Sequence, residues 1–471
     1  MTTNASRREF LRRASLLSVA GATATPFALN LMTLGTAAAQ TVPADYKALI
    51  CLFMQGGNDS HHMVLATDPA VYAAYTGIRK TVDAAQIALD PATLLPISLA
   101  TPQAVSTNFA LHPNMAGVQQ LFAARRAAIV ANVGPLVAPL TKAQWNAHSV
   151  PVPRSLFSHN DQVSTWQASA PEGTRTGWGG RMGDLLAAGN AKSTFTCISL
   201  SGSALLLSGN SVLPFNVGAN GSVAVNGLSG SLFGVPAGSA AYRSIITGAR
   251  SHLFEKQITS VTNRSLAGQA DLQAGMLPVS GVAAPTQYLN PNSGLMQDNS
   301  LATAFQTIAR MIGGHSALGA RRQVFFVSVG SFDTHDGQNT RLADFYARIG
   351  HAMTYFDQTM TTLNLVNNVT TFTASDFGRT LASNGDGTDH GWGSHHMVFG
   401  GAVKGGDMYG RFPPYVMNGD QDVGGGRLLP TVSVEQYAGT LARWFGLSDS
   451  EIAGVFPNFA NFGSGALMGF V

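Results

Sequence analysis

The stretch ALICLFMQGGNDSHH, residues 48–62, passes from seven apolar residues through two glycines to five polar side chains. An apolar run of this length that ends at glycines predicts a strand buried on both faces, here over 47–54. Polar residues just past such a strand lie where open α/β sheets bind their ligands. The alternative is an ordinary solvated turn, because Gly and Asn are common in turns. The stretch therefore predicts a strand of an α/β sheet followed by candidate functional residues.

The rest of the chain alternates between strand and helix patterns. Three more runs are rich in Ile, Val, Phe and Thr and predict strands: 127–133, 324–329 and 369–375. Residues 341–365 carry apolar side chains three or four positions apart, which predicts an amphipathic helix. Ser433 and Gln436 form a capping-box pattern before another helix. This alternation predicts an α/β fold, with a mainly parallel sheet sandwiched by helices.

Residues 193–242 differ from the rest because they contain no charged side chain. Short apolar pieces separated by Gly and Asn predict hairpins rather than helices. We interpret this segment as a β-rich cap inserted into one α/β domain that spans residues 40–471. Plain packing is the simplest role for it. A pocket wall for an uncharged part of a substrate and a docking face are the alternatives.

The N-terminus carries an export pattern. Arg7 and Arg8 precede an apolar stretch, and Ala37-Ala38-Ala39 forms a small-residue cleavage site before Gln40. Residues 1–39 therefore predict a twin-arginine signal peptide, with the twin-arginine translocase as a partner during export. The expected location of the mature protein is periplasmic or secreted.

The signal segment also accounts for the net charge of the chain. The whole chain has a net charge of +3, and residues 1–39 hold four arginines against Glu9, so the remainder is formally neutral. Overall charge therefore gives no reason to expect a nucleic-acid partner. After the N-terminus no apolar run is long enough for a stable membrane span. Cys51 and Cys197 lie in apolar runs, which favours two buried free thiols over a disulfide.

Asp and His side chains gather where the predicted strands end. Asp333 and His335 follow the strand at 324–329, and Asp376 follows the strand at 369–375. His390 lies a little later, in GDGTDHGWGSHH at 385–396. Carboxylate oxygens and neutral imidazole nitrogens are the usual ligands of Zn²⁺ and similar ions. The pattern indicates one metal site, although a lone Asp-x-His is equally typical of a turn and a helix cap.

These motifs resemble those of the alkaline-phosphatase-like superfamily, which includes sulfatases and phosphomutases. GGND, FDTHDGQ, SDFGRT and GTDHGWGSHHMVFGGAVKGG resemble more closely a bacterial family of twin-arginine exported proteins of unknown function within it. The superfamily resemblance implies one or two divalent ions, Zn²⁺ or Mn²⁺, held between strand ends. It also implies a Ser, Thr or modified Cys at a helix start that attacks a phosphate or sulfate ester.

Carried over residue by residue, the resemblance implies the following metal ligands: Asp59 after the first strand, Asp333, His335 and His390 on one ion, and Asp376 on the second. Asn58 is a rival of Asp59 and a catalytic candidate. Two departures from the superfamily pattern imply that one metal is missing or held differently. Phe377 stands where the superfamily has a His directly after the strand-end Asp, and Asp333 and His335 are spaced more tightly. Any of His61, His62, His395 and His396 remains open as a compensating ligand.

The nucleophile is expected near Ser158, which precedes a helical pattern. A nucleophile at a helix start gains from the positive end of the dipole, although Ser158 as a simple helix cap is the alternative. His159 is a candidate ligand or general base. Neither cysteine has the setting of a formylglycine-type sulfatase.

The sequence as a whole predicts an exported, metal-dependent hydrolase of phosphate- or sulfate-type esters, with a small-molecule or polymer substrate. The alternative is a non-catalytic envelope or secreted protein that keeps the fold for binding or assembly.

Overall fold

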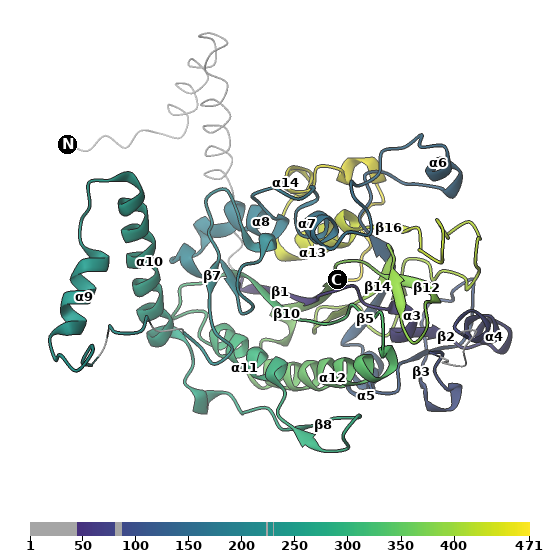
Figure 1. Cartoon of the computed structure of the whole chain (residues 1–471), viewed down its shortest axis with the longest axis horizontal. Coiled ribbons are helices and arrows are strands. Elements are labelled where there is room, and N and C mark those ends of the chain that lie inside the picture. Colours follow the sequence, from purple (N-terminus) through teal and green to yellow (C-terminus); the bar gives the residue numbers. More distant parts are fainter. Residues whose placement is uncertain (1–44, 81–86, 223–224, 229) are drawn as a thin grey trace, which may run out of the picture. The chain divides into compact units, whose positions relative to one another are not determined.

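The computed structural model describes residues 45–80, 87–222, 225–228 and 230–471 (Figure 1). The predicted signal peptide and its cleavage site lie outside the described residues. The centre of the fold is a nine-stranded sheet in the order β15-β5-β14-β11-β1-β10-β6-β7, with β16 paired to β5. Its strands are β1 (Lys47–Met54), β5 (Ala127–Gly134), β6 (Cys197–Ser199), β7 (Phe215–Asn216), β10 (Arg322–Val329), β11 (Val369–Ser375), β14 (Ser394–Phe399), β15 (Met408–Tyr409) and β16 (Val432–Ser433).

The central sheet is mixed but mainly parallel. β1 lies between β10 and β11 and is parallel to both, with Ile50 opposite Phe325 on one side and Thr371 on the other. Only β14 runs antiparallel to its two neighbours, β11 and β5. The predicted β1 and β11 bounds match the structure, and β5 and β10 differ from their predicted bounds by one or two residues.

Helices cover both faces of the sheet, as Figure 1 shows. Alternate residues of β1 enter two separate apolar clusters: Ile50 and Leu52 belong to one, and Leu49 and Phe53 to the other. The first cluster is completed by α5 (Ala116–Ala123), α11 (Ser300–Gly313) and α12 (Gln338–Thr362). The second is completed by α8 (Trp178–Leu186), α13 (Val434–Phe445) and α14 (Asp449–Val455), with α7 (His159–Ala168) beside them. The predicted α/β sandwich is therefore confirmed.

The structure contains both helices that the sequence predicted. Ser433 and Gln436 form the predicted capping box at the start of α13. The helix predicted at 341–365 is α12, which begins three residues earlier because Gly337 adopts φ 52° and turns the chain into the helix.

The uncharged segment 193–242 is built partly into the main sheet. It supplies β6 and β7 at one end of the sheet and two isolated β-bridges, Gly218 with Gly221 and Leu232 with Val235. The expected β-rich region is present, and its two strands extend the central sheet. β6 and β7 pair in parallel, so they do not form a predicted hairpin, and residues 238–242 already belong to α9 (Gly238–Thr247), which is followed by α10 (Leu253–Gly275).

Smaller elements surround this core. They are the sheet of β2 (Val64–Ala66), β4 (Phe109–Leu111) and β3 (Leu95–Ile97), the pair β8 (Tyr288–Leu289) and β9 (Met296–Gln297), the pair β12 (Arg379–Ser383) and β13 (Thr388–His390), and the helices α3 (Ser60–Met63), α4 (Pro69–Ile78) and α6 (Lys142–Asn146). Cys51 and Cys197 are buried free thiols, as predicted. Across the described part of the chain, every helix is too short or too polar to cross a bilayer.

Candidate metal centre

The candidate site forms where β10 and β11 end on either side of β1. Asp333 lies four residues beyond β10, and Asp376 directly follows β11. Because the carboxyl ends of parallel strands meet at one edge of a sheet, these two carboxylates are brought together. His159, the first residue of α7, and His390, the last of β13, reach the same place from other parts of the chain.

Gly56 and Gly57 allow these loops to close over the end of β1. Both have positive φ angles, 111° and 92°. A Cβ on Gly56 would lie 2.6 Å from the Asp333 nitrogen, and one on Gly57 would overlap the Phe377 ring. The Gly56 N–H also donates to Asp376 Oδ1 at 2.9 Å. The glycine pair of the first-strand motif is therefore required for the close approach of the two other strand ends.

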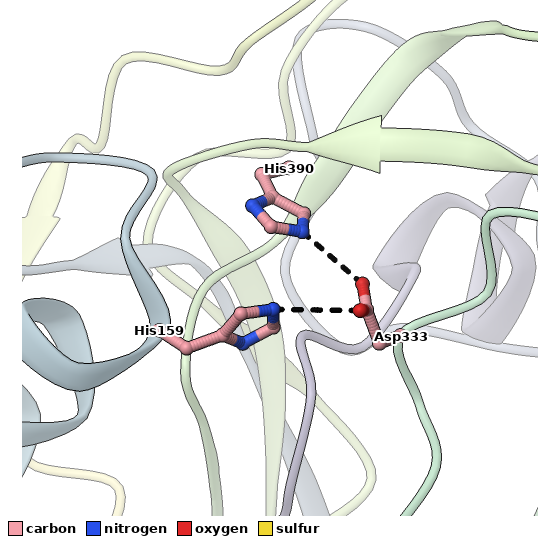
Figure 2. A group of neighbouring side chains, drawn as sticks. All are labelled: His159, Asp333 and His390. Carbon is pink, nitrogen blue, oxygen red and sulfur yellow. Dashed lines mark hydrogen bonds and ion pairs between the residues drawn. The ribbon is translucent and has the colours of Figure 1, made fainter.

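Three histidines point their Nε2 atoms at Asp333. The distances to Oδ1 are 3.0 Å from His335 and 3.2 Å from His390, and His159 lies 3.4 Å from Oδ2. Figure 2 shows His159 and His390 approaching Asp333 from different segments. The Nε2 atoms of His335 and His390 are themselves 3.0 Å apart.

The opposite ring nitrogen of each histidine faces an oxygen. His159 Nδ1 lies 2.8 Å from Asp376 Oδ2, and His390 Nδ1 lies 2.8 Å from the backbone oxygen of Phe157. His335 Nδ1 lies 3.3 Å from Asp389 Oδ1. An acceptor at Nδ1 fixes the tautomer that carries its proton there and leaves the Nε2 lone pair free. The Nε2 lone pairs of His159 and His390, whose Nδ1 contacts are hydrogen bonds, are then directed at the space beside Asp333.

The electrostatic setting keeps Asp333 ionised. Burial raises the pKa of Asp333, but the hydrogen bond and positive charge of Arg379 outweigh that effect and hold it below its ordinary value. Burial lowers the pKa of His390, which favours its neutral form. A carboxylate and a neutral imidazole are the forms that bind a metal.

The donor atoms fit a divalent cation. Asp333 Oδ1 and the Nε2 atoms of His335 and His390 form a triangle with sides of 3.0–3.2 Å. Zn–N and Zn–O bonds of about 2 Å in a tetrahedron place ligand atoms about 3.3 Å apart, close to this triangle. Ligand atoms of His159, Asp333 and His390 also lie within 4.8 Å of one another. Arg379 contacts the same Asp333 oxygen, so the cation would share this carboxylate with a guanidinium group.

A pocket of about 510 Å³ opens beside this group. His159, Asp333 and Asp376 line it together with Gln55, Glu172 and Ser331. Ser331 has φ 75°, a conformation that is uncommon outside glycine and is often found at functional sites. Three carboxyl groups in the wall, from Asp333, Asp376 and Glu172, favour cations over anions in the pocket.

Asp59 is the main correction to the predicted ligand set. It follows β1, as expected, but its carboxylate is fully buried and bound by Arg79 at 2.5 Å and 3.1 Å. The Gln338 side chain donates to Asp59 Oδ2 at 2.7 Å. Asp59 Oδ1 accepts from the His61 N–H and so caps the start of α3. An internal cation therefore already compensates this carboxylate, and Asp59 does not join Asp333 and Asp376.

Asn58 also takes a structural position. Its backbone N–H donates to Ser375 Oγ at 2.9 Å, and its side-chain oxygen accepts from Tyr346 at 2.7 Å. Because it is fully buried, Asn58 links the end of β1 to β11 and α12 and cannot contact a substrate in the pocket. The catalytic role considered for Asn58 is therefore corrected as well.

The other histidines considered as ligands, and Ser158 and Phe377, lie as follows. His62 contacts Asn339 and the Asp59–Arg79 pair, and His61, His395 and His396 are buried away from Asp333. Ser158 precedes α7 but makes no capping hydrogen bond with its side chain. Phe377 packs its ring against His159 and His390, with centroids 4.9 Å and 4.6 Å away. The departure at Phe377 thus gives the histidines an apolar support in place of a ligand.

Sequence reasoning missed several contributors to the site. Arg379 and Asp389 stand within the motifs that drew attention, and Ser331 stands just after a predicted strand, so position relative to strand ends is a usable signal for them. The carbonyl of Phe157 carries no such signal, because any residue supplies a backbone oxygen.

Comparisons with known proteins found one matching family model and several solved structures of low similarity. Residues 259–453 match a family described as a protein of unknown function (DUF1501). No curated protein matches the sequence. Similar solved structures include a protein from work on the metabolism of multiple glycosaminoglycans by Bacteroides thetaiotaomicron, with 11% identity, a TM-score of 0.34, and coverage of 86% of this chain and 74% of that one.

Two further solved structures are similar at the same low level. Ps i-CgsB, also solved in complex with k-i-k-neocarrahexaose, has 9% identity, a TM-score of 0.33, and coverage of 86% of this chain and 74% of that one. A mutant of the alkaline phosphatase PafA has 12% identity, a TM-score of 0.25, and coverage of 72% and 64%.

Proposed function

We propose that this protein is a metal-dependent hydrolase of phosphate- or sulfate-type esters. The observation that carries the proposal is the convergence of three histidine Nε2 atoms on Asp333, at 3.0–3.4 Å, beside a pocket of about 510 Å³. Zn²⁺ or Mn²⁺ is the expected ion, because imidazole and carboxylate donors suit both. When bound, such an ion supplies positive charge that polarises an ester oxygen.

Other side chains at the site would orient the histidines, keep Asp333 ionised and contact the ester. Asp376 holds the His159 ring through Nδ1, and the Phe157 carbonyl holds the His390 ring in the same way. Arg379 keeps Asp333 ionised. Gln55, which lines the pocket, offers an amide that can hydrogen-bond an ester oxygen.

Two serines compete for the role of nucleophile. Ser158 lies at the positive end of α7 and leaves its hydroxyl out of the helix cap. Ser331 lines the pocket itself and is exposed. The matched variants Ser158→Ala and Ser331→Ala distinguish them, since only loss of the attacking hydroxyl abolishes turnover while leaving metal content unchanged.

The proposal is tested by metal analysis and hydrolysis assays on the purified chain. We expect at least one divalent ion per chain and chelator-sensitive hydrolysis of p-nitrophenyl phosphate or p-nitrophenyl sulfate. His390→Ala should lower both, whereas His148→Ala, at an exposed position outside the site, should change neither. The proposal is contradicted if the protein binds no divalent ion and its melting temperature does not change when a chelator is added. That result would favour a non-catalytic binding or assembly role.

We further propose that the protein acts after export, in the periplasm or outside the cell, on a small-molecule or polymer ester. The arginine pair, apolar stretch and cleavage pattern of residues 1–39 support this part of the proposal.

A further inference from the structure

The α9–α10 helical hairpin stands apart from the helices that cover the central sheet, as Figure 1 shows. Its two helices are joined by residues 248–252. Thr259 and Asn263 of α10 donate side-chain hydrogen bonds to the backbone oxygens of Gly248 and Thr247, both at 3.4 Å. These contacts show which side of α10 faces α9.

The opposite side of α10 carries an exposed apolar stripe. Phe254, Ile258 and Val261 have the i, i+4, i+7 spacing that aligns side chains along one helix face. Phe254 is 73% exposed and Ile258 is 65% exposed. Leu253, at the start of the helix, is 74% exposed, and Ile245 on α9 is 61% exposed. We call these five residues the apolar tip. Large apolar side chains gathered at this exposure usually mark an interaction surface.

Positive charge is concentrated on the same hairpin as the apolar tip, with Lys256 on the side of α10 that carries Thr259. Arg243, Arg250, Lys256 and Arg264 are all exposed. Glu255 is the only acidic residue between positions 185 and 270 of the sequence. Outside residues 1–39 the chain is formally neutral, so the charge of +3 over residues 238–264 is a local concentration rather than a reflection of composition.

We propose that the α9–α10 hairpin binds the surface of membranes that contain anionic lipids. A helix with Phe and Leu on one face and Lys and Arg around it lies in the headgroup region, with its apolar side chains among the upper acyl chains. Exposed basic side chains of the hairpin pair with lipid phosphates, and the near absence of acidic residues removes repulsion from that surface. This inference is independent of the proposed ester hydrolysis, since none of these residues lines the metal site or its pocket.

Charge complementarity favours a lipid surface over a second copy of this chain. In a symmetric pairing of hairpins, the four cations of one copy would face the four cations of the other, with only Glu255 to offset them. An anionic bilayer instead presents negatively charged headgroups that pair with the basic side chains. Its acyl chains lie just below the headgroups, where Phe254 and Leu253 can reach them.

The test is flotation of the purified full chain with large unilamellar vesicles of phosphatidylglycerol and phosphatidylcholine in equal parts, compared with vesicles of phosphatidylcholine alone. We expect binding to the anionic vesicles that weakens with salt, and little binding to the neutral ones. Each basic residue near the surface contributes about fivefold in partitioning, so Arg250→Gln with Arg264→Gln should weaken binding by more than tenfold. Leu253→Ser with Phe254→Ser should also weaken binding strongly.

Matched controls separate the hairpin from other exposed groups. Leu295→Ser removes an exposed apolar side chain from the β8–β9 turn, and Lys404→Gln removes an exposed cation elsewhere on the chain. Both should bind vesicles like the wild type. Because residues 1–39 are the same in every variant, differences between variants report the hairpin and not the N-terminal arginines.

Three results would overturn the proposal. They are absence of binding to the anionic vesicles, equal binding by the wild type and both hairpin variants, and equal binding to anionic and neutral vesicles. Sedimentation velocity on the same samples tests the alternative that the hairpin binds a second copy of this chain. A dimer that Leu253→Ser with Phe254→Ser dissociates, without vesicle binding by the wild type, would assign the hairpin to self-association instead. Circular dichroism on each variant shows whether it has retained its fold.

Discussion

His335 and His390 face each other through Nε2 atoms 3.0 Å apart, and both contact the same oxygen of Asp333. Each ring directs its Nδ1 at another oxygen, from Asp389 and from the backbone of Phe157. If both rings carry their proton on Nδ1, two lone pairs point at each other, which is unfavourable until a cation lies between them. The pair is therefore the centre of the proposed cation site.

We expect added Zn²⁺ to stabilise chelator-treated protein. A ligand that binds only the folded state adds about 2.7 kcal/mol to the free energy of unfolding when its free concentration is 100 times the Kd. Urea denaturation with and without Zn²⁺ measures this gain. The double variant His335→Ala, His390→Ala should lose it, because two of the three donor atoms of the triangle are gone. Full stabilisation of the double variant would show that the ion binds elsewhere.

Asp376→Asn tests the support of His159. The carboxylate accepts from His159 Nδ1 at 2.8 Å and from the Gly56 N–H at 2.9 Å. Loss of such a supporting carboxylate usually lowers metal affinity or activity 10- to 100-fold, and we expect a change of about that size. Competition with a chromophoric chelator measures the affinity. An unchanged affinity would mean that His159 does not bind the ion.

Asp59→Asn should destabilise the fold and leave metal content unchanged. Asp59 and Arg79 are both fully buried, so the variant leaves a buried guanidinium without its counter-charge. Such a loss costs about 3–5 kcal/mol in the free energy of unfolding.

The matched control for this loss is Asp336→Asn, which breaks an exposed pair with Arg341 and should cost less than about 1 kcal/mol. The double variant Asp59→Asn, Arg79→Met should recover part of the loss, because it removes the unpaired charge as well. Loss of bound metal in Asp59→Asn would restore Asp59 as a ligand.

Stability should fall as the pH drops below about 6.5. Burial lowers the pKa of each of four histidines to about 3: His61, His112, His395 and His396. Their unfolded pKa is about 6.5, so between pH 6.5 and 3 the unfolded state binds protons that the folded state does not. Each histidine then removes up to about 1.4 kcal/mol of stability per pH unit, and above pH 6.5 the effect disappears.

Urea denaturation at pH 7.5, 6.5, 5.5 and 5.0 measures this pH dependence. His396→Gln should make the slope shallower by about one quarter, since it removes one of the four groups. A slope that is the same in this variant would show that other groups carry the acid sensitivity.

Changing Arg7 and Arg8 to Lys should trap the precursor in the cytoplasm, because the twin-arginine translocase reads the arginine pair. Cell fractionation and N-terminal sequencing measure the outcome, and the wild type should begin at or near Gln40 outside the inner membrane. Normal export of the double variant would rule out this route.

The sequence by itself determined the layered architecture. The apolar run at 47–54 and the run rich in Val, Phe and Thr at 369–375 predicted β1 and β11 to the residue, because β-branched and aromatic side chains favour buried strands. It also predicted that Asp333, His335, Asp376 and His390 lie together, since parallel strands deliver the residues that follow them to one edge of the sheet.

The tertiary structure decided which of the polar residues share a site. Asp59 and Asp376 both follow a buried strand, and nothing local separates them. Asp59 is bound instead by Arg79, a residue 20 positions away, and Asp376 is bound by His159, which is 217 positions away. Such pairings depend on how loops and helices pack over the sheet edge, so the pattern along the chain does not encode them. The same reason explains the Phe157 carbonyl, because a backbone oxygen becomes a partner of His390 only through its position in space.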